Sequence, residues 1–145
     1  MGLIYSLTCK NKDCRYSVQL REGPGFSLFA RDKNLEESIL SGEEKVSDEI
    51  KALLEKGLKV DSVTTLLCPC CKEYQICREP YVFEPIHVSP YGTIREYKIH
   101  FIYGDPCCEK CKTKLIHILN PRSSKNICPK CGIGEMRYSG TGCYD

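Results

Sequence analysis

The sequence predicts a small α+β fold that is stabilised by bound metal ions rather than by one large apolar core. The chain of 145 residues contains twelve cysteines, and eight of them fall in four close pairs. Trp is absent and Phe occurs only four times, so few large side chains are present to fill a single core. β-rich segments flank the pairs, and one helical segment interrupts them. At this size a structural metal ion supplies stability that the core alone does not.

The four close pairs have the spacing of metal-binding turns. They are Cys9/Cys14, Cys68/Cys71, Cys108/Cys111 and Cys128/Cys131. The last three have a two-residue spacer, which places two thiolates on one side of a tight turn, about 2.3 Å from a common metal ion. The backbone N–H groups of such a turn point at the sulfur atoms and stabilise them. We therefore expect two zinc ions per chain, each bound by four cysteines, although iron accepts the same four thiolates.

The residue after the second cysteine of such a turn commonly has positive φ, which favours glycine. Gly132 meets this expectation. Arg15, Lys72 and Lys112 stand at the same place in the other three turns, where each is expected to cost about 1 kcal/mol unless the turn geometry differs. The four-residue spacer of the first pair predicts a different geometry there.

The spacing leaves open which turns share a metal ion. Sequential pairing joins the first pair to the second and the third to the fourth, and gives each half of the chain its own closed unit. An interleaved scheme instead joins Cys68/Cys71 to Cys108/Cys111. We favour sequential pairing, which predicts one domain at 1–86 and a second at 87–145. Pro85 and Pro90 mark the boundary between them.

Periodicity places the secondary structure around these turns. Short strands are expected at 3–8, 16–21, 60–67, 73–83, 93–103 and 115–119, and a polar loop at 120–126. Between residues 32 and 57 the pattern is helical. Asn34, with Glu37 three residues later, matches a capping box, and Gly42 ends that helix. A second helix ends at Gly57 and has apolar residues at helical spacing: Val46, Ile50, Leu53 and Leu54.

The cysteine turns resemble those of zinc ribbons, in which two turns at the tips of β-hairpins bind one ion. Residues 93–145 resemble a compact ribbon. The first half resembles uncharacterised bacterial two-ribbon zinc-binding proteins with a helical insertion, through Tyr5, Cys9, Cys14, Tyr16, Gly23, Gly25, Cys68 and Cys71. The resemblance implies two zinc ribbons built from short antiparallel β-hairpins, the first with a helical insertion at about 32–57. It implies a fold and a metal, and no activity.

Four further cysteines are expected to be small buried residues or bystanders: Cys70, Cys77, Cys107 and Cys143. Cys107 is an alternative ligand to Cys108, and Cys70 is an alternative to a member of its own turn. The three histidines lack ligand spacing to one another and are expected to be structural, with His100 and His117 as alternative ligands.

Charge and targeting signals narrow the possible partners. The formal net charge of +2 becomes −2 when two metal ions are bound by eight thiolates, because each four-cysteine site carries −2. A near-neutral to slightly acidic chain is a poor candidate for non-specific nucleic-acid binding. No signal peptide and no apolar run long enough to cross a bilayer are visible, so we expect a cytoplasmic, reducing location and no membrane partner.

Two segments of opposite charge suggest two different kinds of partner. Residues 32–56 carry eight acidic residues against four Lys, and the apolar segment 25–29 precedes them. Residues 107–145 carry seven Lys or Arg against three acidic residues. The first segment suits a protein partner and the second a nucleic acid. The plain alternatives are solvated charges and apolar residues that pack the helices onto a sheet.

We expect a zinc-binding structural or regulatory protein-interaction module. A nucleic-acid-binding protein that uses its C-terminal ribbon is the second interpretation, and an iron-bound, rubredoxin-like electron carrier is the third. No Ser–His–Asp set and no suggestive carboxylate pair is visible in the sequence, and four cysteines around a metal leave no open position for a substrate. No catalytic residue is therefore assigned.

Overall fold

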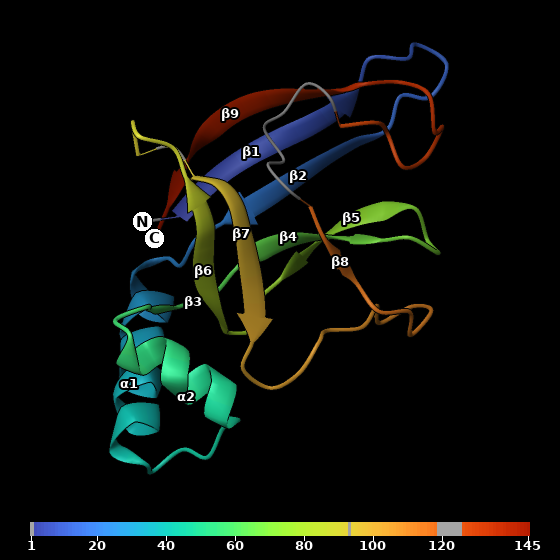
Figure 1. Ribbon diagram of the computed structural model, residues 1–145. Coiled ribbons are helices and arrows are strands. Elements are labelled where there is room, and N and C mark those ends of the chain that lie inside the picture. Colours follow the sequence, from blue (N-terminus) through green and yellow to red (C-terminus); the bar gives the residue numbers. More distant parts are fainter. Residues whose placement is uncertain (1, 93, 119–125) are drawn as a thin grey trace.

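A computed structural model describes residues 2–92, 94–118 and 126–145. Within these ranges, nine strands pair antiparallel in three three-stranded sheets. Two helices lie between the second and third strands of the chain. The predicted small α+β fold is confirmed. Figure 1 shows the helices at one end of the molecule and the four cysteine turns at the other. The predicted polar loop lies outside the described residues except for Asn126, and so do Arg122 and Lys125, two of the seven basic residues counted in 107–145.

The first sheet joins the two ends of the chain. Its order is β2-β1-β9, with β1 (Gly2–Cys9) between β2 (Ser17–Glu22) and β9 (Met136–Tyr144). Tyr5 and Leu7 of β1 are fully buried in a cluster that also contains cysteines of the first and last cysteine turns. Strand β9 is not predicted by the sequence pattern, because Gly140 and Gly142 weaken its alternation. The pairing of β1 with β9 places both termini side by side (Figure 1).

The other two sheets also combine strands from both predicted domains. One has the order β3-β6-β7, formed by β3 (Val60–Asp61), β6 (Tyr81–Val88) and β7 (Ile94–Phe101). The other has the order β5-β4-β8, formed by β4 (Thr64–Cys68), β5 (Glu73–Cys77) and β8 (Ile116–His117). The predicted boundary between residues 86 and 87 falls inside β6. Pro85 lies in that strand opposite Tyr97, and the register shifts immediately after it.

Both predicted helices are present, but the first begins earlier than expected. Helix α1 (Phe26–Ser41) follows Gly25 and ends at Gly42, whose φ is 87°. The predicted capping box is wrong, because Asn34 lies in the middle of α1. Helix α2 (Asp48–Glu55) begins after Ser47, whose Oγ accepts the Ile50 N–H at 3.3 Å. The predicted apolar face of α2 packs in one cluster with α1 and strands β3 and β6: Ile39, Ile50, Leu53, Leu54, Val60 and Val82.

Buried polar contacts connect the sheets to α1. The hydroxyl groups of Tyr5 on β1 and Thr65 on β4 lie 2.6 Å apart, and the Ser62 hydroxyl donates to the Asp32 carboxylate of α1 at 2.5 Å. Between these contacts Val63 is 2% exposed with a φ of 64°, a conformation that β-branched residues rarely adopt. The single strand predicted at 60–67 is therefore interrupted at residues 62–63.

Candidate metal centres

Eight cysteines of the four turns gather in two groups of four. The outer cysteine group contains Cys9, Cys14, Cys128 and Cys131, and the inner cysteine group contains Cys68, Cys71, Cys108 and Cys111. In each group all four sulfur atoms lie within 4.8 Å of one another. The sequential pairing favoured by the sequence is wrong. The inner group follows the interleaved alternative, and the outer group combines the first turn with the last.

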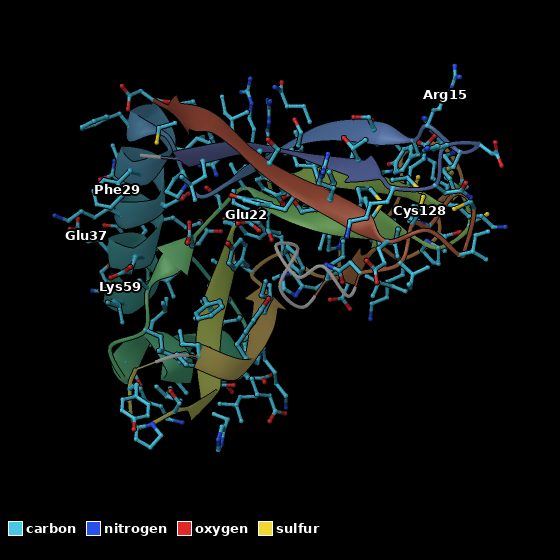
Figure 2. The ribbon with its side chains drawn as sticks, turned by 90° about the horizontal axis from the view of Figure 1, so that it is seen from above. Arg15, Glu22, Phe29, Glu37, Lys59 and Cys128 are labelled. Atoms are coloured by element: carbon cyan, nitrogen blue, oxygen red, sulfur yellow. The ribbon has the colours of Figure 1, made fainter. Side chains whose placement is uncertain are left out.

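Strand pairing explains this nested arrangement. In the β1–β9 pair, Cys9 lies opposite Met136, and the Lys10 N–H donates to the Glu135 carbonyl at 2.9 Å. The turn before β9 is thereby brought beside the turn after β1 (Figure 2, with Cys128 and Arg15 labelled). In the same way β4 pairs with β8 through Leu67 and Ile116, which brings the second and third turns together.

Two of the six distances between sulfur atoms in each group match those of a tetrahedral metal site, and the others are at most 4.8 Å. The Sγ–Sγ distances are 3.7 Å for Cys9–Cys131, 3.7 Å for Cys14–Cys128, 3.5 Å for Cys68–Cys111 and 3.9 Å for Cys71–Cys108. Four sulfurs placed about 2.3 Å from one metal ion at the corners of a tetrahedron are separated by about 3.8 Å. A disulfide requires about 2.05 Å, and all of these cysteines are unbridged. Each group could therefore hold one metal ion.

Positive φ occurs after the second cysteine of all four turns. The φ angles are 54° at Arg15, 56° at Lys72, 63° at Lys112 and 73° at Gly132. In the three short turns this residue donates its N–H to the carbonyl of the first cysteine, at 2.8 to 2.9 Å. In the first turn the Arg15 N–H is 3.4 Å from the carbonyl of Asn11. Asn11 thus occupies the place of the first cysteine, and Cys9 reaches the group from two residues upstream.

Polar groups favour the thiolate form at Cys111 and Cys131, whereas burial raises the pKa of Cys9 and the neighbouring Cys111 raises the pKa of Cys71. N–H donors approach the sulfurs of Cys9, Cys68 and Cys131 from the backbone at 3.3 to 3.4 Å, and Gln75 Nε2 approaches that of Cys108 at 3.2 Å. The backbone N–H groups of Ile133 and Gly134 lower the pKa of the Cys131 thiol to about 6. The hydroxyl and then the backbone of Thr113 lower the pKa of Cys111 to about 6. Each group therefore has a thiol that is predisposed to bind a cation.

Burial separates the eight cysteines from three of the other four. The first cysteine of each pair is buried and the second is partly exposed. Cys107 is exposed while Cys108 is 1% exposed and belongs to the inner group, so Cys107 does not take its place. Cys70 and Cys143 are also exposed, and Cys77 is the one of the remaining four that is buried as expected.

The alternative histidine ligands lie elsewhere. His100 Nε2 lies 3.1 Å from the Glu84 carboxylate and its Nδ1 lies 3.5 Å from Glu49. His117 packs edge-on against the ring of Tyr97, and burial lowers the pKa of its imidazole to about 4. Neither belongs to a cysteine group.

No protein-family model, no curated protein and no solved structure matches this chain. The resemblance to zinc ribbons therefore rests on the cysteine turns. Among the described residues, neither helix has the length and apolar character that a membrane crossing requires.

Proposed function

We propose that the chain is a zinc-binding structural module in which each cysteine group binds one ion through all four sulfurs. The observation that supports this most directly is the agreement of the Sγ–Sγ distances with a tetrahedral site. Zinc is the ion that most often occupies closed four-cysteine sites in proteins. With four protein ligands the metal has no open position, which favours a structural role over a catalytic one.

The core of the protein indicates what the metal contributes. The buried apolar residues divide into three small clusters, and cysteines of the two groups belong to two of them. Structural zinc contributes free energy of folding on the order of 10 kcal/mol. The described clusters are small, so metal binding and folding are expected to occur together. Elemental analysis of natively purified protein tests this directly: two zinc ions per chain support the proposal, and iron in their place would indicate an electron carrier.

We also propose that α1 presents a contact surface to a protein partner. Phe26 is 72% exposed and Phe29 is 58% exposed. Leu40 is 42% exposed and lies on the same side of the helix three turns after Phe29, with the exposed Lys33 and Glu37 between them. Phe26 and Phe29 therefore do not pack the helix onto a sheet, as the plain alternative required of them, whereas Leu28, the other apolar side chain of the segment 25–29, is half-buried. Figure 2 shows Phe29 and Glu37 on the side of α1 that faces away from the sheets.

The acidic charges near these exposed apolar side chains are fewer than the sequence suggests. Asp32 is buried beside Ser62, and the Glu36 carboxylate accepts hydrogen bonds from Lys59 and from the backbone of Val60. Six acidic residues of the segment remain for the surface, together with its four lysines. A partner that is mainly apolar, with a modest basic character, fits this composition.

Nucleic acid is the second candidate, and one observation weakens it. Lys110 and Lys130 form ion pairs with Glu73, and Lys114 forms one with Asp105. Three of the basic residues that suggested nucleic-acid binding are therefore partly neutralised within the protein. Arg15, Lys72 and Lys112, exposed at the ends of their turns, are the cations that favour this interpretation.

Two sets of variants separate these functions. The double substitution Phe26→Ser and Phe29→Ser should abolish capture of the protein partner by the chain and leave the zinc content unchanged. The control is Tyr91→Ser, at a side chain that is 96% exposed, which should leave this capture intact. If the nucleic-acid interpretation holds, the parent chain should retard a nucleic acid in a gel, and this retardation should weaken steeply with salt. The triple substitution Arg15→Glu, Lys72→Glu and Lys112→Glu should abolish it. Capture that survives the Phe substitutions would contradict the role of α1.

A further inference from the structure

The two cysteine groups are in direct contact through Lys130 and Glu73. Lys130 lies between the two cysteines of the fourth turn, in the outer group. Its Nζ donates to the Cys71 carbonyl of the inner group at 3.2 Å and to Glu73 Oε1 at 2.9 Å. Glu73 also accepts from Lys110, within the third turn, at 3.1 Å. One carboxylate thus binds a turn of each group, and these two lysines lower its pKa.

A second contact lies beside the first. Tyr16 follows Cys14 of the outer group by two residues, and its hydroxyl oxygen accepts the backbone N–H of Tyr74 at 3.0 Å. The two rings stack with centroids 6.4 Å apart, and Lys130 Nζ lies 5.9 Å from the centroid of the Tyr16 ring. Tyr74 is 6% exposed, so this junction is largely closed to solvent on its side.

We propose that the two cysteine groups bind their metal ions cooperatively, and that Lys130 and Glu73 carry the coupling. The proposal rests on the proposed metal binding. A metal ion in the outer group fixes the turn that contains Lys130, which holds the ammonium against Cys71 and Glu73. The second and third turns are then partly ordered before the inner group is loaded, so less conformational entropy is lost on the second binding event.

Charge between the two groups opposes this coupling, and Lys130 reduces the opposition. Each loaded group carries a charge of −2, because four thiolates surround a divalent ion. Two such centres in neighbouring turns repel each other. The ammonium of Lys130 lies at their contact, with its side chain 36% exposed, and lowers this repulsion. Binding without this side chain is therefore expected to be less cooperative.

Native mass spectrometry of the full chain during zinc titration against a competing chelator tests the coupling. It counts chains with no, one or two ions. When the average loading is one ion per chain, independent sites leave at least half of the chains singly loaded, whether or not their affinities are equal. For two sites of equal affinity, a fivefold coupling, at the low end of typical values, lowers that fraction to about a third. We expect about a third or less, and a fraction of half or more would overturn the proposal.

Substitutions locate the coupling. Lys130→Met and Glu73→Gln should each raise the singly loaded fraction towards half while two ions still bind at saturation. The control is Glu135→Gln, which removes the exposed Lys10–Glu135 pair of the outer group and touches no residue of the junction. If both junction variants remain as cooperative as the parent chain, Lys130 and Glu73 do not carry the coupling. A chain that never binds two ions would refute the proposed function instead.

Discussion

The sulfur atoms of Cys9 and Cys131 lie 3.7 Å apart although 122 positions separate the two residues in the chain. The outer cysteine group therefore joins the first strand to the segment before the last one. The inner group lies between its members in the sequence. This nesting has consequences that differ from those of two consecutive metal-binding units.

Removal of one cysteine of the outer group should release the other cysteines of that group from the metal ion. We expect Cys131→Ser to lower the zinc content from two ions to one per chain, and to make Cys9 and Cys14 reactive towards an alkylating reagent. Mapping of the alkylated cysteines by mass spectrometry gives the result. The inner cysteines should stay protected in excess zinc, because their four sulfurs remain together. Reaction at Cys108 and Cys111 in place of Cys9 and Cys14 would restore the sequential pairing.

A methyl group at Gly134 should damage the outer group selectively. A Cβ at this position would lie 2.5 Å from Cys9 Sγ and 2.9 Å from the Asn11 Cβ, closer than such atoms approach. We expect Gly134→Ala to weaken one of two zinc affinities at least tenfold, a cost of about 1.4 kcal/mol, as measured by chelator competition. Gly140→Ala is the matched control, since its nearest contact would be an ordinary 3.6 Å. Equal effects of both substitutions would contradict this description of the site.

Glycine should stabilise two of the turns. Lys72 and Lys112 are exposed and have φ angles of 56° and 63°. Relief of the left-handed conformation should raise the free energy of unfolding of Lys72→Gly or Lys112→Gly by up to about 1 kcal/mol. Lys56→Gly, where φ is −74°, should instead lower it by about 0.5 kcal/mol. Denaturant unfolding at a fixed free zinc concentration measures all three, and a loss of stability at Lys72 would argue against the turn geometry.

The helix boundaries can be tested with two alanine substitutions. Ser47→Ala should lower the free energy of unfolding by about 1 kcal/mol, because the hydroxyl accepts an N–H at the start of α2. Asn34→Ala should be neutral or stabilising by a few tenths of a kcal/mol, because Ala has the higher propensity within a helix. Urea unfolding distinguishes these results from those of a capping box at Asn34, for which the Asn34 substitution would be the costly one.

Much of the local structure follows from the sequence. The apolar spacing of Ile50, Leu53 and Leu54 predicts α2, and the spacing of Cys128 and Cys131 predicts a tight turn with positive φ at the next residue. Both features depend on residues that are close together in the sequence. The start of α1 is not predictable in the same way, because Gly25 precedes it and no side chain caps it.

The sequence by itself determined the four cysteine turns, the positive φ after them, helix α2 and most of the short strands. The tertiary structure decided which turns share a sulfur cluster. The decision depends on strand β9, whose pairing with β1 places residue 136 opposite residue 9. Spacing along the chain contains no information about such a contact, since a loop of any of these lengths closes at similar entropic cost. The exposure of Phe26 and Phe29 was decided in the same way, by which face of α1 the sheets leave uncovered.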